Sequence, residues 1–285
     1  MKPPLLFILV FLIFGQLKAQ QSILFKIKYV PALSYDTNIS MEMNMTGDAA
    51  DMEKIKASGT KMPVTMTTST KMTTSVQTGT VNAASEFPII FTFKDIKSTK
   101  AVNGTETSSP ANPIIGVKIY GTYTTEGKIT LDSIPGKALN ESIKTVISSM
   151  LSSLINQLRF PEKALSPGES FTQEVPFNLP VAGFNMASTI KIVYKLISIE
   201  NNSAFFDMDQ SMNFDMNMEK DGVKMTGKGI GKGGGKLVYD IAHNFPTTMS
   251  NGLDFNYQMQ IKTMTMTGKA KITSVHETKI TPATK

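Results

Sequence analysis

The 285-residue chain contains no cysteine and no tryptophan, and only two histidines. Without cysteine there are no disulfides, no thiolate metal sites and no lipid attached through an N-terminal cysteine. His243 and His276 stand alone, so Ser-His and Cys-His catalysis have little to build on. The absence of tryptophan, a common sugar platform, argues mildly against glycoside hydrolysis by paired carboxylates. We therefore expect a protein that is not an enzyme and that an apolar core alone holds together.

Long basic clusters are also missing, although the formal net charge is +6. The lysines are scattered and mostly alternate with apolar residues, which is typical of the solvated face of a β-sheet. A nucleic-acid surface needs clustered basic residues and aromatic platforms. We expect no nucleic-acid partner.

The first 19 residues have the pattern of a secretory signal peptide. Lys2 supplies a positive charge, and residues 5–14 form an apolar run that is too short to span a bilayer as a helix. Cleavage after Ala19 leaves residues 20–285 as a single exported β-rich domain without a transmembrane segment. We expect a periplasmic, outer-membrane-associated or extracellular protein; the rival hypothesis is an uncleaved anchor.

Methionine alternates with polar residues in the segments 41–46 and 212–219, where Phe214 takes one methionine position. A period of two indicates β-strands with one buried face and one wet face. Methionine is unbranched and adapts to irregular gaps, so these strands predict a deformable apolar interior. Residues 253–261 alternate in the same way, and a change of parity near 262–263 predicts a β-bulge.

The segment 140–158 predicts a long amphipathic helix. Apolar residues recur there at positions i, i+4, i+7 and i+8, Asn140 suits the N-cap, and Pro161 ends the element. Such a wide apolar stripe must be covered. We therefore predict a mainly β fold: a strongly curved, half-barrel-like antiparallel sheet with this helix packed on its concave face.

Two parts of the chain resemble each other, which suggests two related halves, 20–135 and 160–285, joined by the helix. Residues 35–45 resemble residues 206–218 in their Asp, Ser and alternating Met. Each of these segments follows a segment in which Ile and Lys recur, at 25–29 and 190–194. We expect the first of these to belong to a strand at 23–30 and the second also to be a strand.

Three motifs resemble ligand sites. Residues 222–228, which lead into the glycine cluster at 227–236, match the G-x-x-x-x-G-K part of a phosphate loop. However, Gly229 stands where Ser or Thr must bind magnesium, and no helix is expected to follow. We therefore interpret the cluster as a glycine-rich strand end where the sheet bends or another backbone packs closely. The acids at 207–219 fail the calcium-loop pattern and fit the wet face of a strand. Methionines spaced by one residue are soft ligands suited to Cu(I), but the histidines are remote from them. We expect no metal and no cofactor, with Cu(I) binding as a minor alternative.

Residues 160–171, with the sequence Phe-Pro-Glu-Lys-Ala-Leu-Ser-Pro-Gly-Glu-Ser-Phe, follow the apolar helix and open a strand. They resemble the Leu-Pro-x-Lys-x-Val-x-x-Gly-Asp-x-Trp passage of a family of uncharacterised exported β-rich proteins from Bacteroidota, with Phe171 where tryptophan is usual. The resemblance covers most of 22–280 and implies a compartment and an architecture only. More distantly, a curved sheet clasping a helix is similar to periplasmic lipoprotein carriers, which is an analogy of fold alone.

These observations lead to two functional hypotheses. The first is a non-enzymatic exported protein that holds a lipid, a hydrophobic peptide or another apolar ligand between sheet and helix. The second is an envelope structural or interaction module with a filled core and a protein partner. The first predicts a cavity of about a few hundred Å³ between helix and sheet, and the second predicts none. The expected lining residues are Met41, Met43, Met45, Met150, Leu154, Met212, Phe214 and Met216.

Overall fold

A computed structural model describes residues 22–49, 63–108, 114–134, 145, 158–181, 184–220, 223–261 and 264–283. Its named elements are all β-strands: β1 (Leu33–Ala49), β2 (Val64–Thr78), β3 (Glu86–Val102), β4 (Thr105–Ser108), β5 (Lys118–Thr124), β6 (Ile129–Ser133), β7 (Ser170–Val181), β8 (Phe184–Glu200), β9 (Ser203–Lys220), β10 (Val223–Asp240), β11 (Phe245–Ile261) and β12 (Met264–Pro282).

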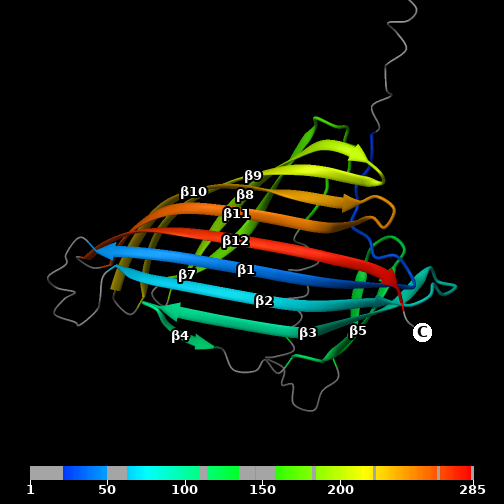
Figure 1. The fold of residues 1–285 in the computed structure, drawn as a ribbon, viewed down its shortest axis with the longest axis horizontal. Coiled ribbons are helices and arrows are strands. Elements are labelled where there is room, and N and C mark those ends of the chain that lie inside the picture. Colours follow the sequence, from blue (N-terminus) through cyan, green and yellow to red (C-terminus); the bar gives the residue numbers. More distant parts are fainter. Residues whose placement is uncertain are drawn as a thin grey trace, which may run out of the picture.

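These strands form one large open antiparallel sheet, in the order β6-β5-β3-β2-β1-β12-β11-β10-β9-β8-β7, with β4 paired to β3 off this path (Figure 1). The predicted mainly β antiparallel fold is confirmed. The first and last strands meet in the middle, where Leu33 lies opposite Pro282 and Ala49 opposite Met266. The two predicted halves fall on either side of this β1–β12 ladder, and whether they are a duplication stays a prediction.

Two other predictions fall on residues outside the described ranges. The predicted helix at 140–158 lies there apart from Thr145 and Leu158, so the structure does not support it or its place on the sheet. The predicted signal peptide at 1–19 also lies outside. Within the described part of the chain, no helix is both long and apolar enough to cross a membrane.

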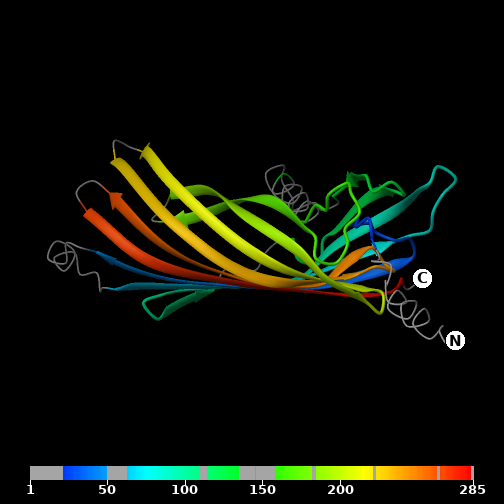
Figure 2. The same ribbon diagram turned by 90° about the horizontal axis from the view of Figure 1, so that it is seen from above.

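The long strands bend, so that the sheet has a concave and a convex face (Figure 2). The concave face, here called the inner face, carries the buried side chains of Tyr35, Phe255 and Tyr257, and residues 22–30 pack against it. Along β1, β11 and β12, every described Lys, Asp and Glu side chain stands on the opposite, outer face. The predicted alternation of buried and wet positions is confirmed for these strands, because parity assigns each residue to one face.

The strand predicted at 23–30 is wrong. Ile23 alone makes a bridge, with Leu165, and the rest of the segment forms no strand. Its backbone groups find other partners: Val30 N donates to Tyr35 Oη at 2.7 Å, and Lys28 N donates to Asn244 O at 3.0 Å. The segment carries two large aromatic side chains, Phe25 and Tyr29, into the core.

Those two rings organise two aromatic cores at one end of the sheet. The Phe25 ring lies 5.3 Å from Phe160, 5.2 Å from Phe206 and 5.1 Å from Tyr239, measured between centroids. Tyr29 likewise contacts the rings of Tyr35, Phe91, Tyr123 and Phe245. Phe25 is 1% exposed. The N-terminal segment thus fills this end of the concave face.

The β-bulge predicted near 262–263 is also wrong. β11 ends at Ile261, β12 begins at Met264, and these two residues pair across a hairpin. The inner face takes odd-numbered residues on β11 and even-numbered residues on β12. This change follows from the reversal of the chain, because Ile261 and Met264 pair directly and therefore share a face.

Candidate functional site

The end of the inner face remote from the aromatic cores is lined by a cluster of buried apolar side chains, here called the methionine cluster. Methionine is its commonest residue, and its members come from β1 and β9–β12. None carries a formal charge. They are Met45, Met212, Phe214, Met225, Leu253, Phe255, Tyr257, Met259 and Ala270.

Glycines leave room for the large members of this cluster. Every second residue of β10 from 227 to 235 is glycine, on the inner face. A Cβ atom at Gly229 would lie 2.0 Å from Phe214 Cε1, and one at Gly268 would lie 2.3 Å from Tyr257 Cζ. The aromatic rings therefore lie across the glycine backbone. The close packing predicted at 227–236 is confirmed, but it occurs inside β10 rather than at a strand end.

The structure brings together several of the residues predicted to line a ligand site. Met45, Met212 and Phe214 are buried in the methionine cluster, and Met43 is partly buried against it. Met41 stands on the same face of β1 but is 42% exposed. Met216 is on β9, opposite Gly227 of β10, and the side chain of Met216 is not described. Met150 and Leu154 lie outside the described residues.

Sequence reasoning missed five large members of the cluster: Met225, Leu253, Phe255, Tyr257 and Met259. The signal was present for most of them, because the alternation over 253–261 predicts a strand with these residues on one face. The alternation did not show which strands lie beside this one, so it did not place these residues in the cluster.

A partly open apolar strip, here called the apolar ledge, borders the methionine cluster on β1, β2 and β3. It consists of Met41, Met43, Met66 and Val102. Met66 lies opposite both Met45 of the cluster and Val102, which is 39% exposed. The ledge therefore leads from solvent on the inner face to the buried cluster.

Hydrogen-bonded polar residues separate the methionine cluster from the aromatic cores. Ser274 Oγ donates to Asn251 Oδ1 at 3.0 Å, and the hydroxyls of Thr37 and Thr278 lie 2.9 Å apart. Burial lowers the pKa of neighbouring His276, which favours its neutral form. Among the described residues, no buried side-chain nitrogen or oxygen lacks a hydrogen-bond partner. These polar residues therefore form a largely uncharged part of the interior in which the buried side-chain polar groups are hydrogen-bonded.

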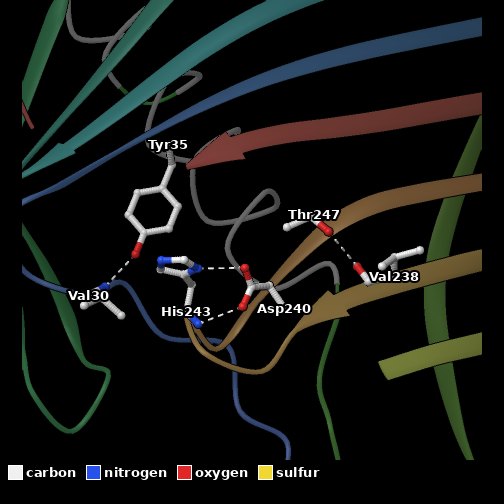
Figure 3. Close-up of polar contacts among 6 residues, drawn as sticks. All are labelled: Val30, Tyr35, Val238, Asp240, His243 and Thr247. Atoms are coloured by element: carbon white, nitrogen blue, oxygen red, sulfur yellow. Dashed lines mark hydrogen bonds and ion pairs between the residues drawn. The ribbon is translucent and has the colours of Figure 1, made fainter. Parts of the chain in front are cut away.

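The turn between β10 and β11 holds an Asp–His pair (Figure 3). Asp240 Oδ2 lies 2.7 Å from His243 Nδ1, and Asp240 Oδ1 accepts a hydrogen bond from the His243 backbone N at 3.0 Å. Partial burial raises the pKa of Asp240, but the hydrogen bonds from His243 outweigh it, so its pKa lies below the usual value. Because both carboxylate oxygens contact the same turn residue, the pair serves to hold the turn.

Two carboxylates on the outer face of β9 lie opposite lysines of β10. Asp207, Asp209 and Asp215 are exposed on β9, as predicted for a wet face. Lys236 Nζ lies 3.6 Å from Asp207 Oδ1, and Lys228 is opposite Asp215. In the described ranges, no group of three or more His, Cys, Asp or Glu could hold a metal ion. Cu(I) binding by methionine stays a prediction.

Two hollows, of about 810 and 240 Å³, lie over β11, β12 and β1. Outer-face side chains dominate their lining, and both include Thr46, Asn256 and Lys269. Neither hollow is the cavity predicted between sheet and helix.

Comparison with models of protein families and with curated proteins gives no match. Among solved structures, the chain is similar to lipovitellin, in a structure concerned with lipid–protein interactions, at 9% identity and a TM-score of 0.46 over 90% of this chain. It spans 26% of that chain, about a quarter of its length. It is also similar to OccK5 (OpdH) of Pseudomonas aeruginosa, at 8% identity and a TM-score of 0.27, covering 86% of this chain and 98% of that one. The resemblance to the Bacteroidota family stays a prediction.

Proposed function

We propose that the protein binds an apolar ligand on the inner face of its sheet and catalyses no reaction. The observation that carries this proposal is the apolar ledge, which is partly exposed and continuous with the methionine cluster. An exposed apolar surface that continues into an interior is a frequent mark of a ligand site.

The chemistry of the cluster suits a ligand without a fixed shape. Methionine side chains have three rotatable bonds and a polarisable sulfur, so they repack around a guest at low cost. Phe214 and Tyr257 lie over Gly229 and Gly268, so no side chain of those two positions projects between the rings and the sheet. The signal-like pattern at 1–19 supports an exported location, so the proposed ligand is a lipid or hydrophobic peptide of the envelope or its surroundings.

The second candidate is a structural or interaction module with a filled core. Met225, Phe255 and Met259 are each exposed by 1% or less, which is the observation that favours it. In the described part of the chain, the strands at the sheet edges are poor templates for pairing with a partner strand. β4 has four residues and β6 has five, and β7 carries Pro176 and Pro180, which lack backbone N–H groups.

Native mass spectrometry of the protein purified from its own envelope, followed by organic extraction, tests the proposal. We expect a stoichiometric apolar mass, and protein that is refolded after removal of this ligand should take up the uncharged dye N-phenyl-1-naphthylamine. Val102→Glu and Met43→Glu should reduce dye uptake by placing a charge on the ledge. Glu42→Gln, on the outer face beside Met43, is the matched control.

Val102 is already 39% exposed, so its variant keeps the test meaningful if Met43→Glu fails to fold. A clean apo mass with no dye uptake by the folded protein would overturn the proposal and favour the filled-core module.

A further inference from the structure

A single lysine interrupts the uncharged inner face beside the apolar ledge. Along the described parts of β1, β2, β11 and β12, no Lys, Asp or Glu stands on the inner face. Lys100 on β3 is opposite Thr68, and Thr68 is opposite Met43. Residues directly opposite each other in a ladder share a face, so Lys100 belongs to the inner face.

Residues with hydroxyl groups occupy the positions next to this lysine on the inner face. Ser98 precedes it by two residues and therefore shares its face. Ser98 lies opposite Thr70, and their hydroxyl oxygens are 3.2 Å apart. Thr68, the cross-strand neighbour of Lys100, adds a third hydroxyl. One cation and three hydroxyls thus form a polar corner at the rim of the inner face, where Lys100 is exposed.

The polar corner and the apolar ledge are adjacent. Lys100 and Met43 occupy one cross-strand row, two strands apart, so their backbones are separated by about 10 Å. Val102, also of the ledge, is two residues beyond Lys100 on the same strand and face. A molecule with an anionic head at Lys100 can therefore lay an apolar chain over Val102 and Met43 towards Met45.

We infer that the ligand is a long-chain fatty acid, with its carboxylate bound by Lys100 and the neighbouring hydroxyls and its chain on the apolar ledge. The inference rests on the proposed function, because it names the class of the apolar ligand. A carboxylate matches a site with one positive charge and hydroxyl donors, since charge-assisted hydrogen bonds are strong. A cationic or zwitterionic head would meet no acid on the inner face of the four strands named above.

Displacement of N-phenyl-1-naphthylamine from the full chain tests the inference, with lauric acid, dodecanol and dodecylamine as ligands of equal chain length. At low ionic strength and near neutral pH, laurate should bind about tenfold more tightly than dodecanol, the gain expected for one charged hydrogen bond. Lys100→Gln should abolish that preference, chiefly by weakening laurate binding. Lys100→Glu should disfavour laurate and favour dodecylamine.

Lys97→Gln is the matched control, because Lys97 is three residues away on the same strand, opposite Lys71 on the outer face. It should leave all three affinities unchanged. Equal affinities for laurate and dodecanol, or a preference that survives in Lys100→Gln, would overturn the fatty-acid inference while the proposed function stands. Failure of the dye and of all three ligands to bind would overturn both.

Discussion

Phe214 lies across Gly229 of the neighbouring strand, and the two residues are directly opposite each other in the β9–β10 ladder. The glycine is there for space: its φ angle lies outside the left-handed region, and a Cβ atom would meet the ring at 2.0 Å. The ring in turn covers a stretch of backbone that glycine leaves bare, an arrangement that stabilises glycines in sheets. The same relationship recurs between Tyr257 and Gly268.

Gly229→Ala should destabilise the protein by about 1–3 kcal/mol, because the added methyl group forces Phe214 out of its position. Gly252→Ala is the matched control, since the nearest atom to a Cβ there is 3.8 Å away. Its effect should be neutral or slightly stabilising, because alanine restricts the unfolded chain. Urea denaturation of both variants measures the difference, and equal effects would show that Phe214 does not need the space.

Phe214→Leu should partly rescue Gly229→Ala, because a smaller side chain removes the clash. A double-mutant cycle measures this coupling, which should be favourable for residues in direct contact. Additive effects would contradict the contact between the ring and the glycine.

Phe25→Ala should destabilise the protein by about 3–5 kcal/mol, the usual cost of removing a fully buried aromatic side chain. Phe25 is 1% exposed and packs on three aromatic rings, although it belongs to no strand. The neighbouring Leu24 is 44% exposed, so Leu24→Ala should have little effect. Thermal unfolding compares the two; similar small shifts would mean that residues 22–30 are not part of the core.

Stability should fall as the pH rises from about 10 towards 12. Burial raises the pKa of Tyr35, Tyr194 and Tyr239 to about 12, from a model-compound value of 10.0. The unfolded chain therefore loses these protons first, and proton release favours unfolding across that interval. Chemical denaturation at a series of alkaline pH values should show the decline, and Tyr194→Phe should make it shallower. Phenolate absorbance that rises without unfolding would contradict the burial of these side chains.

Asp240 should make a contribution to stability that disappears at low pH. Its pKa is held below the usual value, so the contribution is complete above the unfolded pKa of about 4 and is lost as the pH falls through the folded pKa. Asp240→Asn should flatten the acid limb of the stability profile measured by urea denaturation. The flattening should be smaller in a His243→Ala background, because alanine has no side-chain donor for Asp240; an equal flattening would exclude the His243 side chain as its source.

Much of the inner face is predictable from local pattern. Met43, Met45, Met212 and Phe214 fall on the buried side because strand side chains alternate between two faces, whatever the neighbouring strand is. The acids of β9 fall on the wet side for the same reason. Local pattern does not predict the structure of the segment 22–30. Its residues alternate as in a strand, but its backbone groups bond to a side chain and to loops instead of a neighbouring strand. Its aromatic rings enter two separate cores.

The sequence by itself determined which side of most strands is buried and that methionine lines the interior, since both follow from residue type and a period of two. Only the tertiary structure decided that β1 pairs with β12, that glycines of β10 lie beneath Phe214, and that Lys100 shares a row with Met43. Those relationships depend on strand order and register. Contacts between residues far apart in the chain set both, and no local pattern encodes them.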